Sequence, residues 1–135
     1  MIRKIKEKFY SLIKEAGYNI TDNGTYVESF PWLMLRLGNA SNLHSFDLNV
    51  DAISLTLDVF STYNGELEVI EIIEDITKKL QGLIADMPEL LYAYRKTFKI
   101  IDDKATGPVK KHGIAVFDFL LAQSEKEVPN DASNE

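Results

Sequence analysis

The sequence contains no cysteine among its 135 residues. That absence excludes disulfide bonds, cysteine-ligated zinc and thiol catalysis together. It also lacks an apolar run near the roughly 20 residues of a membrane-spanning helix. No uninterrupted apolar stretch follows Met1, so we expect no secretory signal. A surplus of basic residues is missing too: the net charge is −6, which argues against broad phosphate binding because that task needs a basic face.

What the chain does have is enough apolar material for a core. Apolar residues make up 45% of the sequence, so a packed domain is expected and wholesale disorder is not. Residues 1–122 fit one domain. Residues 123–135 contain almost no apolar side chain, and we expect them to form a flexible C-terminal tail.

The first segment carries apolar residues at three- and four-residue steps from Ile2 to Ala16, with lysines and glutamates between them. This spacing predicts an amphipathic helix that stops near Gly17. Because the helix is basic, it could lie on a membrane surface. We favour the alternative, a helix docked on a sheet.

Asn64-Gly65 raises the main question about the fold, because Asn-Gly is a strong hairpin signal. The residues after it change from alternation to a helical spacing between Val69 and Leu83. We therefore predict a strand-to-helix corner, with Asn64 as the helix N-cap. The helix should end at Asp86-Met87-Pro88, since the residue before proline avoids the helical conformation.

Five extended segments surround this helix. They span Tyr26–Phe30, Trp32–Leu37, Asp51–Phe60, Tyr92–Ile101 and Ile114–Leu121. Residues 39–49 are small and polar, which favours a long mobile loop, and residues 102–113 are typical of a protruding hairpin loop. The order is α-β-β-β-α-β-β. We predict an α+β fold in which two helices pack on one face of a mainly antiparallel, mixed sheet.

Few residues suggest a chemistry. His44 and His112, with Asp47 and the pair Asp102-Asp103 near them, could form a metal site, but metal-ligand spacing is missing and exposed loop histidines are the better interpretation. Turn formation explains the two adjacent aspartates better than acid–base catalysis. We find no catalytic constellation and expect neither an enzyme nor a cofactor.

Two further features each allow two interpretations. Lys104, Lys110 and Lys111 form a basic spot that could touch phosphates or an acidic partner, or could simply keep a hairpin tip soluble. Trp32 could be a partner-binding residue, or a tryptophan of the core or the sheet edge. We favour the second interpretation in both cases.

Several short stretches resemble one protein family. They are "FPWLMLRLG", "ISLTLDVFSTYNGELEVIEIIEDITKKL", "FKIIDD" and "HGIAVFDFLL". Their shared motifs fall on Pro31 to Gly38, Leu55 to Ser61, Tyr63 to Glu68 and His112-Gly113. Together these stretches resemble the small tail-completion proteins of long-tailed bacteriophages, the tail terminator and head–tail joining group. Phe60 stands where the family usually has a tryptophan-like residue.

The resemblance implies a structural virion protein. Such a protein would form a ring, often of six subunits, that caps the tail tube and joins it to the head connector. DNA would pass through the ring as cargo, no membrane would be involved, and the protein would be found in the virion tail and, during assembly, in the host bacterial cytoplasm.

Projecting segments are the expected sites of partner contact. On that basis we expect an interface at Asn39, Asn42, His44, Phe46, Lys104, Lys110 and Lys111. A small cytosolic ligand- or peptide-binding adaptor domain on the same scaffold is the alternative function.

Overall fold

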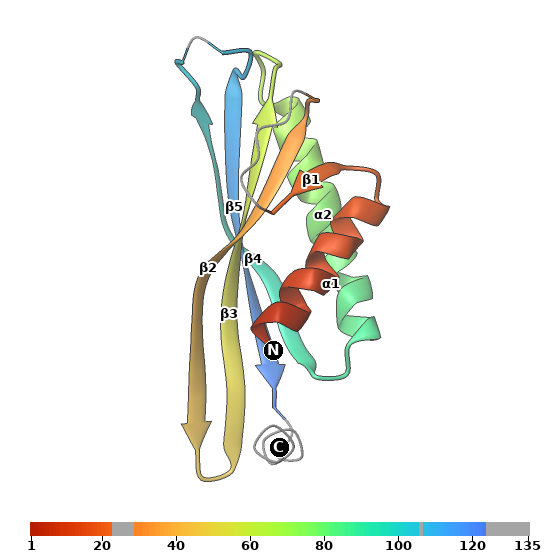
Figure 1. Ribbon diagram of the computed structural model, residues 1–135, viewed down its shortest axis with the longest axis vertical. Coiled ribbons are helices and arrows are strands. Elements are labelled where there is room, and N and C mark those ends of the chain that lie inside the picture. Colours follow the sequence, from red (N-terminus) through yellow and green to blue (C-terminus); the bar gives the residue numbers. More distant parts are fainter. Residues whose placement is uncertain (23–28, 106, 124–135) are drawn as a thin grey trace.

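The computed structural model describes residues 1–22, 29–105 and 107–123. Its elements are α1 (Ile2–Glu15), β1 (Asn19–Thr21), β2 (Trp32–Ser45), β3 (Leu48–Ser61), α2 (Leu67–Asp86), β4 (Leu90–Asp102) and β5 (Lys111–Ala122), shown in Figure 1. The α+β class and the order α-β-β-β-α-β-β are confirmed. The predicted flexible tail falls almost entirely on residues 124–135, which lie outside the described ranges.

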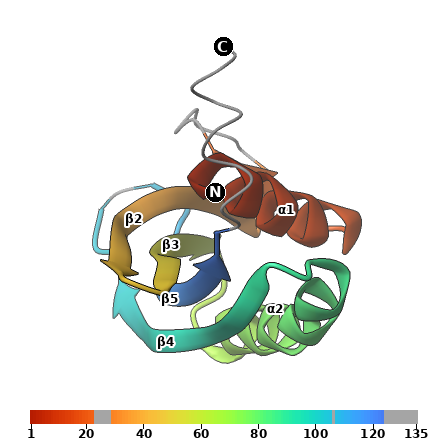
Figure 2. The same ribbon diagram turned by 90° about the horizontal axis from the view of Figure 1, so that it is seen from below.

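The strands form one sheet in the order β1-β2-β3-β5-β4. Only β1 runs parallel to its neighbour, and the other pairs are antiparallel, so the sheet is mixed as predicted. Figure 2 shows the strands curling around one another, with α1 and α2 together on one side. In that view α1 flanks β2 and α2 flanks β4, so the two helices cover the two flanks of one curled sheet.

The core lies between the helices and this face of the sheet. Phe9 of α1 is fully buried and meets Phe117 and Phe119 of β5 edge-on, with ring centroids 5.1 and 5.3 Å apart. Val69 and Ile73 of α2 are also fully buried. Edge-on aromatic pairs contribute about 0.5–1.5 kcal/mol each beyond their burial. Helix α1 is therefore docked on the sheet, the arrangement favoured from its amphipathic spacing.

Asn64-Gly65 lies at a strand-to-helix corner, as predicted, between the end of β3 and the start of α2. The N-cap, however, is Glu66 rather than Asn64. Ser61 orders this corner instead: its hydroxyl accepts a hydrogen bond from Tyr63 N at 3.1 Å and donates to Glu68 Oε1 at 2.5 Å. A carboxylate in the first turn also suits the helix dipole.

Gly113 lets α2 approach the sheet closely. A β-carbon added at this position would lie 2.3 Å from Val69 Cγ1, closer than real atoms pack. The valine is fully buried and branched, so it cannot swing aside at low cost. The glycine that follows His112 is thus explained by the packing of α2 on β5.

The first strand differs from the prediction. The structure places β1 at residues 19–21, where it pairs with Trp32–Met34 of β2. Residues 26–28 of the predicted strand lie outside the described ranges, and Ser29 and Phe30 are not in a strand. Three residues are too few for alternation to reveal a strand in the sequence.

The predicted mobile loop at residues 39–49 is wrong. These residues continue β2 and β3 as a paired hairpin with a two-residue turn at Phe46 and Asp47, in which Ser45 pairs with Leu48. Main-chain hydrogen bonds hold such a ladder whatever the side chains are. Small polar residues therefore did not prevent strand formation here.

Candidate functional site

The hairpin formed by Gly38–Asn49, called the arm below, projects from the domain. Figure 1 shows β2 and β3 running together past the ends of the helices. The arm begins at a register shift between Leu37 and Asn39, where Gly38 forms a β-bulge. Since β1 pairs only as far as Met34, the outer edge of β2 beyond that residue is open among the described residues.

The tip of the arm is apolar and exposed. Phe46 is 104% exposed, and Leu43 and Leu48 are about half exposed, at 51% and 49%. The tip also carries Asp47, and no Lys or Arg occurs between Arg36 and Lys78. The arm therefore offers a partner an aromatic ring beside a negative charge.

Four predicted interface residues come together on this arm: Asn39, Asn42, His44 and Phe46. Asn42 has a structural task there, because its amide donates to Asn49 Oδ1 at 2.8 Å and to Asp51 Oδ1 at 2.9 Å. The other three side chains are exposed.

The three predicted lysines lie elsewhere. Lys111 begins β5 opposite Ser61, at the end of β3 far from the arm. It is half-buried and pairs with Asp102, so its charge is compensated. Lys104 and Lys110 are exposed in the loop before it. The predicted interface is thus two separate patches at opposite ends of the sheet.

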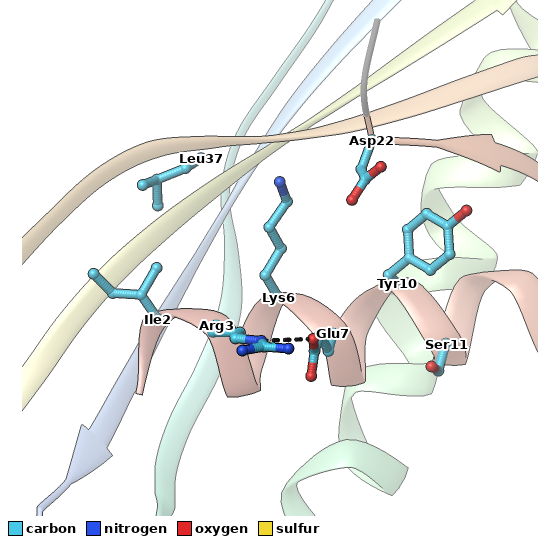
Figure 3. Close-up of a pocket in the computed structure, with 8 residues that line it drawn as sticks. All are labelled: Ile2, Arg3, Lys6, Glu7, Tyr10, Ser11, Asp22 and Leu37. Carbon is cyan, nitrogen blue, oxygen red and sulfur yellow. Dashed lines mark hydrogen bonds and ion pairs between the residues drawn. The ribbon is translucent and has the colours of Figure 1, made fainter. Parts of the chain in front are cut away.

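A groove of about 730 Å³ lies between α1 and β2. It is lined by Ile2, Arg3, Lys6, Glu7, Tyr10, Ser11, Asp22 and Leu37. Figure 3 shows Ile2 and Leu37 at one end, Asp22 and Tyr10 at the other, and the Lys6 side chain extending into the gap between helix and strand.

The groove has partly apolar walls and, among the described residues, one cation without an ion-pair partner. Ile2 is 40% exposed and Leu37 is 45% exposed. Arg3 is paired with Glu7 at 3.0 Å, whereas within the described ranges no carboxylate lies at ion-pair distance from Lys6. The sequence did not reveal this groove, because it depends on where β2 crosses the helix.

A second cluster lies on the sheet face opposite the helices. The carboxylate of Asp58 is buried, with Arg36 Nε 2.7 Å from Oδ2 and His112 Nε2 2.8 Å from Oδ1. Burial by itself raises the pKa of Asp58, but the hydrogen bonds from His112 and Arg36 outweigh it and hold this pKa below its ordinary value. Phe60 stacks between Trp32 and His112 on the same face. Both oxygens of this carboxylate are hydrogen-bonded, so the cluster ties β3 to β2 and β5 in one register.

Trp32 accordingly belongs to the sheet, as favoured from the sequence: it is buried, and its Nε1 donates to Thr21 Oγ1 at 3.0 Å.

Both histidines lie on strands, so their predicted loop positions are wrong. His44 pairs with Asn49 at the tip and His112 pairs with Phe60 near the other end of β3. In the part of the chain that the structure describes, no three His, Cys, Asp or Glu side chains are placed to hold a metal ion. Neither helix in that part has the length and apolar character of a membrane span.

No protein-family model matches this chain, and no curated protein matches it significantly. The fold class is therefore established by the structure alone, and the resemblance to tail-completion proteins stays a prediction. The arm and the groove are two features of the described surface suited to binding a partner.

Proposed function

We propose that the protein is a structural component of a bacteriophage or prophage tail. It assembles into a ring of six subunits that caps the tail tube and joins the tail to the head. The tail-tube protein and the head connector are its partners, and DNA passes through as cargo. An acidic chain suits that passage, because like charge keeps DNA from adhering to the wall.

The observation that carries the proposal is the projecting arm. Exposing a whole phenylalanine ring at a hairpin tip forgoes about 1.5–3 kcal/mol of burial. A tip built in this way is suited to a contact with another chain, where aromatic residues dominate binding energy. A contact between the arm and a different surface of the next subunit is heterologous, and heterologous contacts form a ring where the rotation from one subunit to the next closes.

The motifs shared with tail-completion proteins support the same function. They fall on β2, on β3, on the corner before α2 and on the start of β5. Two of these positions have clear structural roles here: Ser61 hydrogen-bonds at the corner before α2, and Gly113 allows the close approach of α2 to β5.

Native mass spectrometry across a concentration series tests the ring. We expect a discrete six-subunit species that is lost when residues 44–49, which lie between the paired residues Leu43 and Val50, are replaced by a two-residue turn. Immunogold labelling of assembled virions, with antibody against this chain, should then mark the junction of head and tail. A chain that stays monomeric and leaves that junction unlabelled would refute the proposal.

The groove favours a second candidate, an adaptor domain that binds a small ligand or peptide. Its size falls in the range of ligand sites and its walls are partly apolar. This function predicts a monomer or dimer that binds an apolar fluorescent probe in the groove, with binding abolished by Leu37→Asp and unchanged by Phe46→Ser.

A further inference from the structure

We infer that the groove between α1 and β2 receives the arm tip of a second copy of this chain. Phe46 of one copy enters between Ile2 and Leu37 of the next, and Asp47 faces Lys6. The inference deepens the proposed function, since it names the contact that closes the ring.

The two surfaces match in apolar character. The arm tip presents an almost wholly exposed aromatic ring, and the groove presents the half-exposed side chains of Ile2 and Leu37. The groove is larger than one aromatic ring requires, so it has room for the turn residues on either side of Phe46. Docking therefore removes apolar surface from water on both partners.

The two surfaces also match in charge. The stretch from Leu37 to Thr77, which includes the arm, contains no Lys or Arg, and the tip of the arm carries Asp47. Helix α1, in contrast, has more cations than carboxylates: Arg3, Lys4, Lys6, Lys8 and Lys14 against Glu7 and Glu15. Lys6 is the cation that extends into the groove, and within the described ranges it has no ion-pair partner. An incoming Asp47 would supply one.

The arm of the same chain cannot fill its own groove. Leu37 lines the groove and sits directly before the arm, whose strands stay paired up to Ser45 and Leu48. Eight residues of strand, from Gly38 to Ser45, hold Phe46 roughly 26 Å from the base of the arm. A second copy is therefore the occupant, through a contact of unlike surfaces that propagates from copy to copy.

Two carboxylates line the groove, and among the described residues Glu7 is paired with Arg3 whereas Asp22 has no ion-pair partner, so Asp22 is the one that opposes this contact. Figure 3 shows its carboxylate facing the gap from the end of β1. It would repel Asp47, so Asp22→Asn is expected to strengthen self-association while Lys6→Glu weakens it.

Cysteine cross-linking gives the most direct test, because the chain has no cysteine of its own. Ser45→Cys keeps both Phe46 and Asp47, and Ile2→Cys places a thiol on the groove wall. When the two variants are mixed and oxidised, we expect a disulfide-linked heterodimer at least tenfold above the yield from Ser45→Cys with Gln81→Cys, a control thiol exposed on α2. Equal yields from the two mixtures would overturn the inference.

Charge reversal tests the proposed pairing separately. Lys6→Glu and Asp47→Lys should each weaken self-association roughly fivefold, as expected for a partly exposed pair. The double variant should recover most of the wild-type affinity in sedimentation velocity, whereas a double variant weaker than either single variant would contradict the pairing. Circular dichroism checks that each variant is folded.

These results separate the inference from the proposed function. Two results together would overturn the arm-in-groove contact and leave the tail role in place. In the first, six-subunit rings form although Ser45→Cys and Ile2→Cys give no disulfide, and in the second, the rings persist in Phe46→Asp. A monomeric chain that also fails to label virions would refute the function itself.

Discussion

The guanidinium of Arg36 lies against the buried carboxylate of Asp58, with Nε 2.7 Å from Oδ2, and joins β2 to β3 on the face without helices. His112 reaches the same carboxylate from β5. One side chain of the central strand thus bonds to both neighbouring strands. Because a carboxylate only accepts hydrogen bonds, the His112 nitrogen in this contact carries a proton.

Asp58→Asn should lower the free energy of unfolding at pH 7 by about 2 kcal/mol, since hydrogen bonds to a charged group are lost. The pKa of Asp58 is depressed from its ordinary 3.8, so below about that pH the unfolded chain binds a proton that the folded chain still excludes. The stability from this pair is present above pH 3.8 and is lost as the pH falls through the lower, folded-state pKa. Urea unfolding at several pH values should show a shallower acid decline for Asp58→Asn. Phe46→Ser, which removes no charge, should keep the wild-type slope, and an unchanged slope in Asp58→Asn would contradict the assignment.

Gly113→Ala should destabilise the fold by about 1–3 kcal/mol, the usual effect of overpacking a core. The added carbon would collide with Val69 at the start of α2. Gly107→Ala is the matched control, because nothing lies within 4 Å of its added carbon. Thermal unfolding of the two variants measures the difference, and equal midpoints would contradict the close packing of α2 on β5.

The Tyr18 hydroxyl donates to Asp75 Oδ2 at 2.5 Å and ties the segment after α1 to α2. Burial, together with this carboxylate, raises the pKa of Tyr18 to about 12. Asp75→Asn should bring that pKa down toward 10 without reaching it, because burial remains. Ultraviolet titration of the phenolates, with Tyr18→Phe to identify the signal, measures the change; a value unaltered by Asp75→Asn would argue against the contact.

Phe46→Ser should change the free energy of unfolding by less than about 0.5 kcal/mol, the usual range for exposed positions. Phe9→Ala, in contrast, should cost about 3–5 kcal/mol because it empties the core. Urea denaturation of the two variants compares them directly. A large loss in Phe46→Ser would mean that the ring packs within its own chain, against its complete exposure.

The elements that span the core could be predicted because their spacing follows from burial on one face. The stripe of α1 around Phe9, the helix after Asn64-Gly65 and the alternation of β3 all have this origin. The arm escaped prediction because neither of its faces is buried, so its residues carry no alternation. Its strands are held by main-chain pairing across a two-residue turn.

The candidate site divides in the same way. That Phe46 and its neighbours project from the domain could be inferred from their polar surroundings, although not that they form a hairpin. The groove could not be inferred, since Ile2 and Leu37 are 35 residues apart and meet only where the sheet curls past α1. The bond between Asp58 and His112 likewise depends on the register of β3 and β5.

Strand β3 is both the inner strand of the arm and the strand that ends at the Ser61 corner. Its 14 residues form a strand roughly 46 Å long. β5 pairs with β3 from Val50 to Ser61 without a shift in register, whereas the pairing of β2 with β3 shifts at Gly38. We therefore expect the arm to bend at Gly38 of β2. Strand β3, in contrast, runs without a break to Ser61, whose hydroxyl positions the first turn of α2. The tip of the arm and the first turn of α2 are thus joined by one continuous strand.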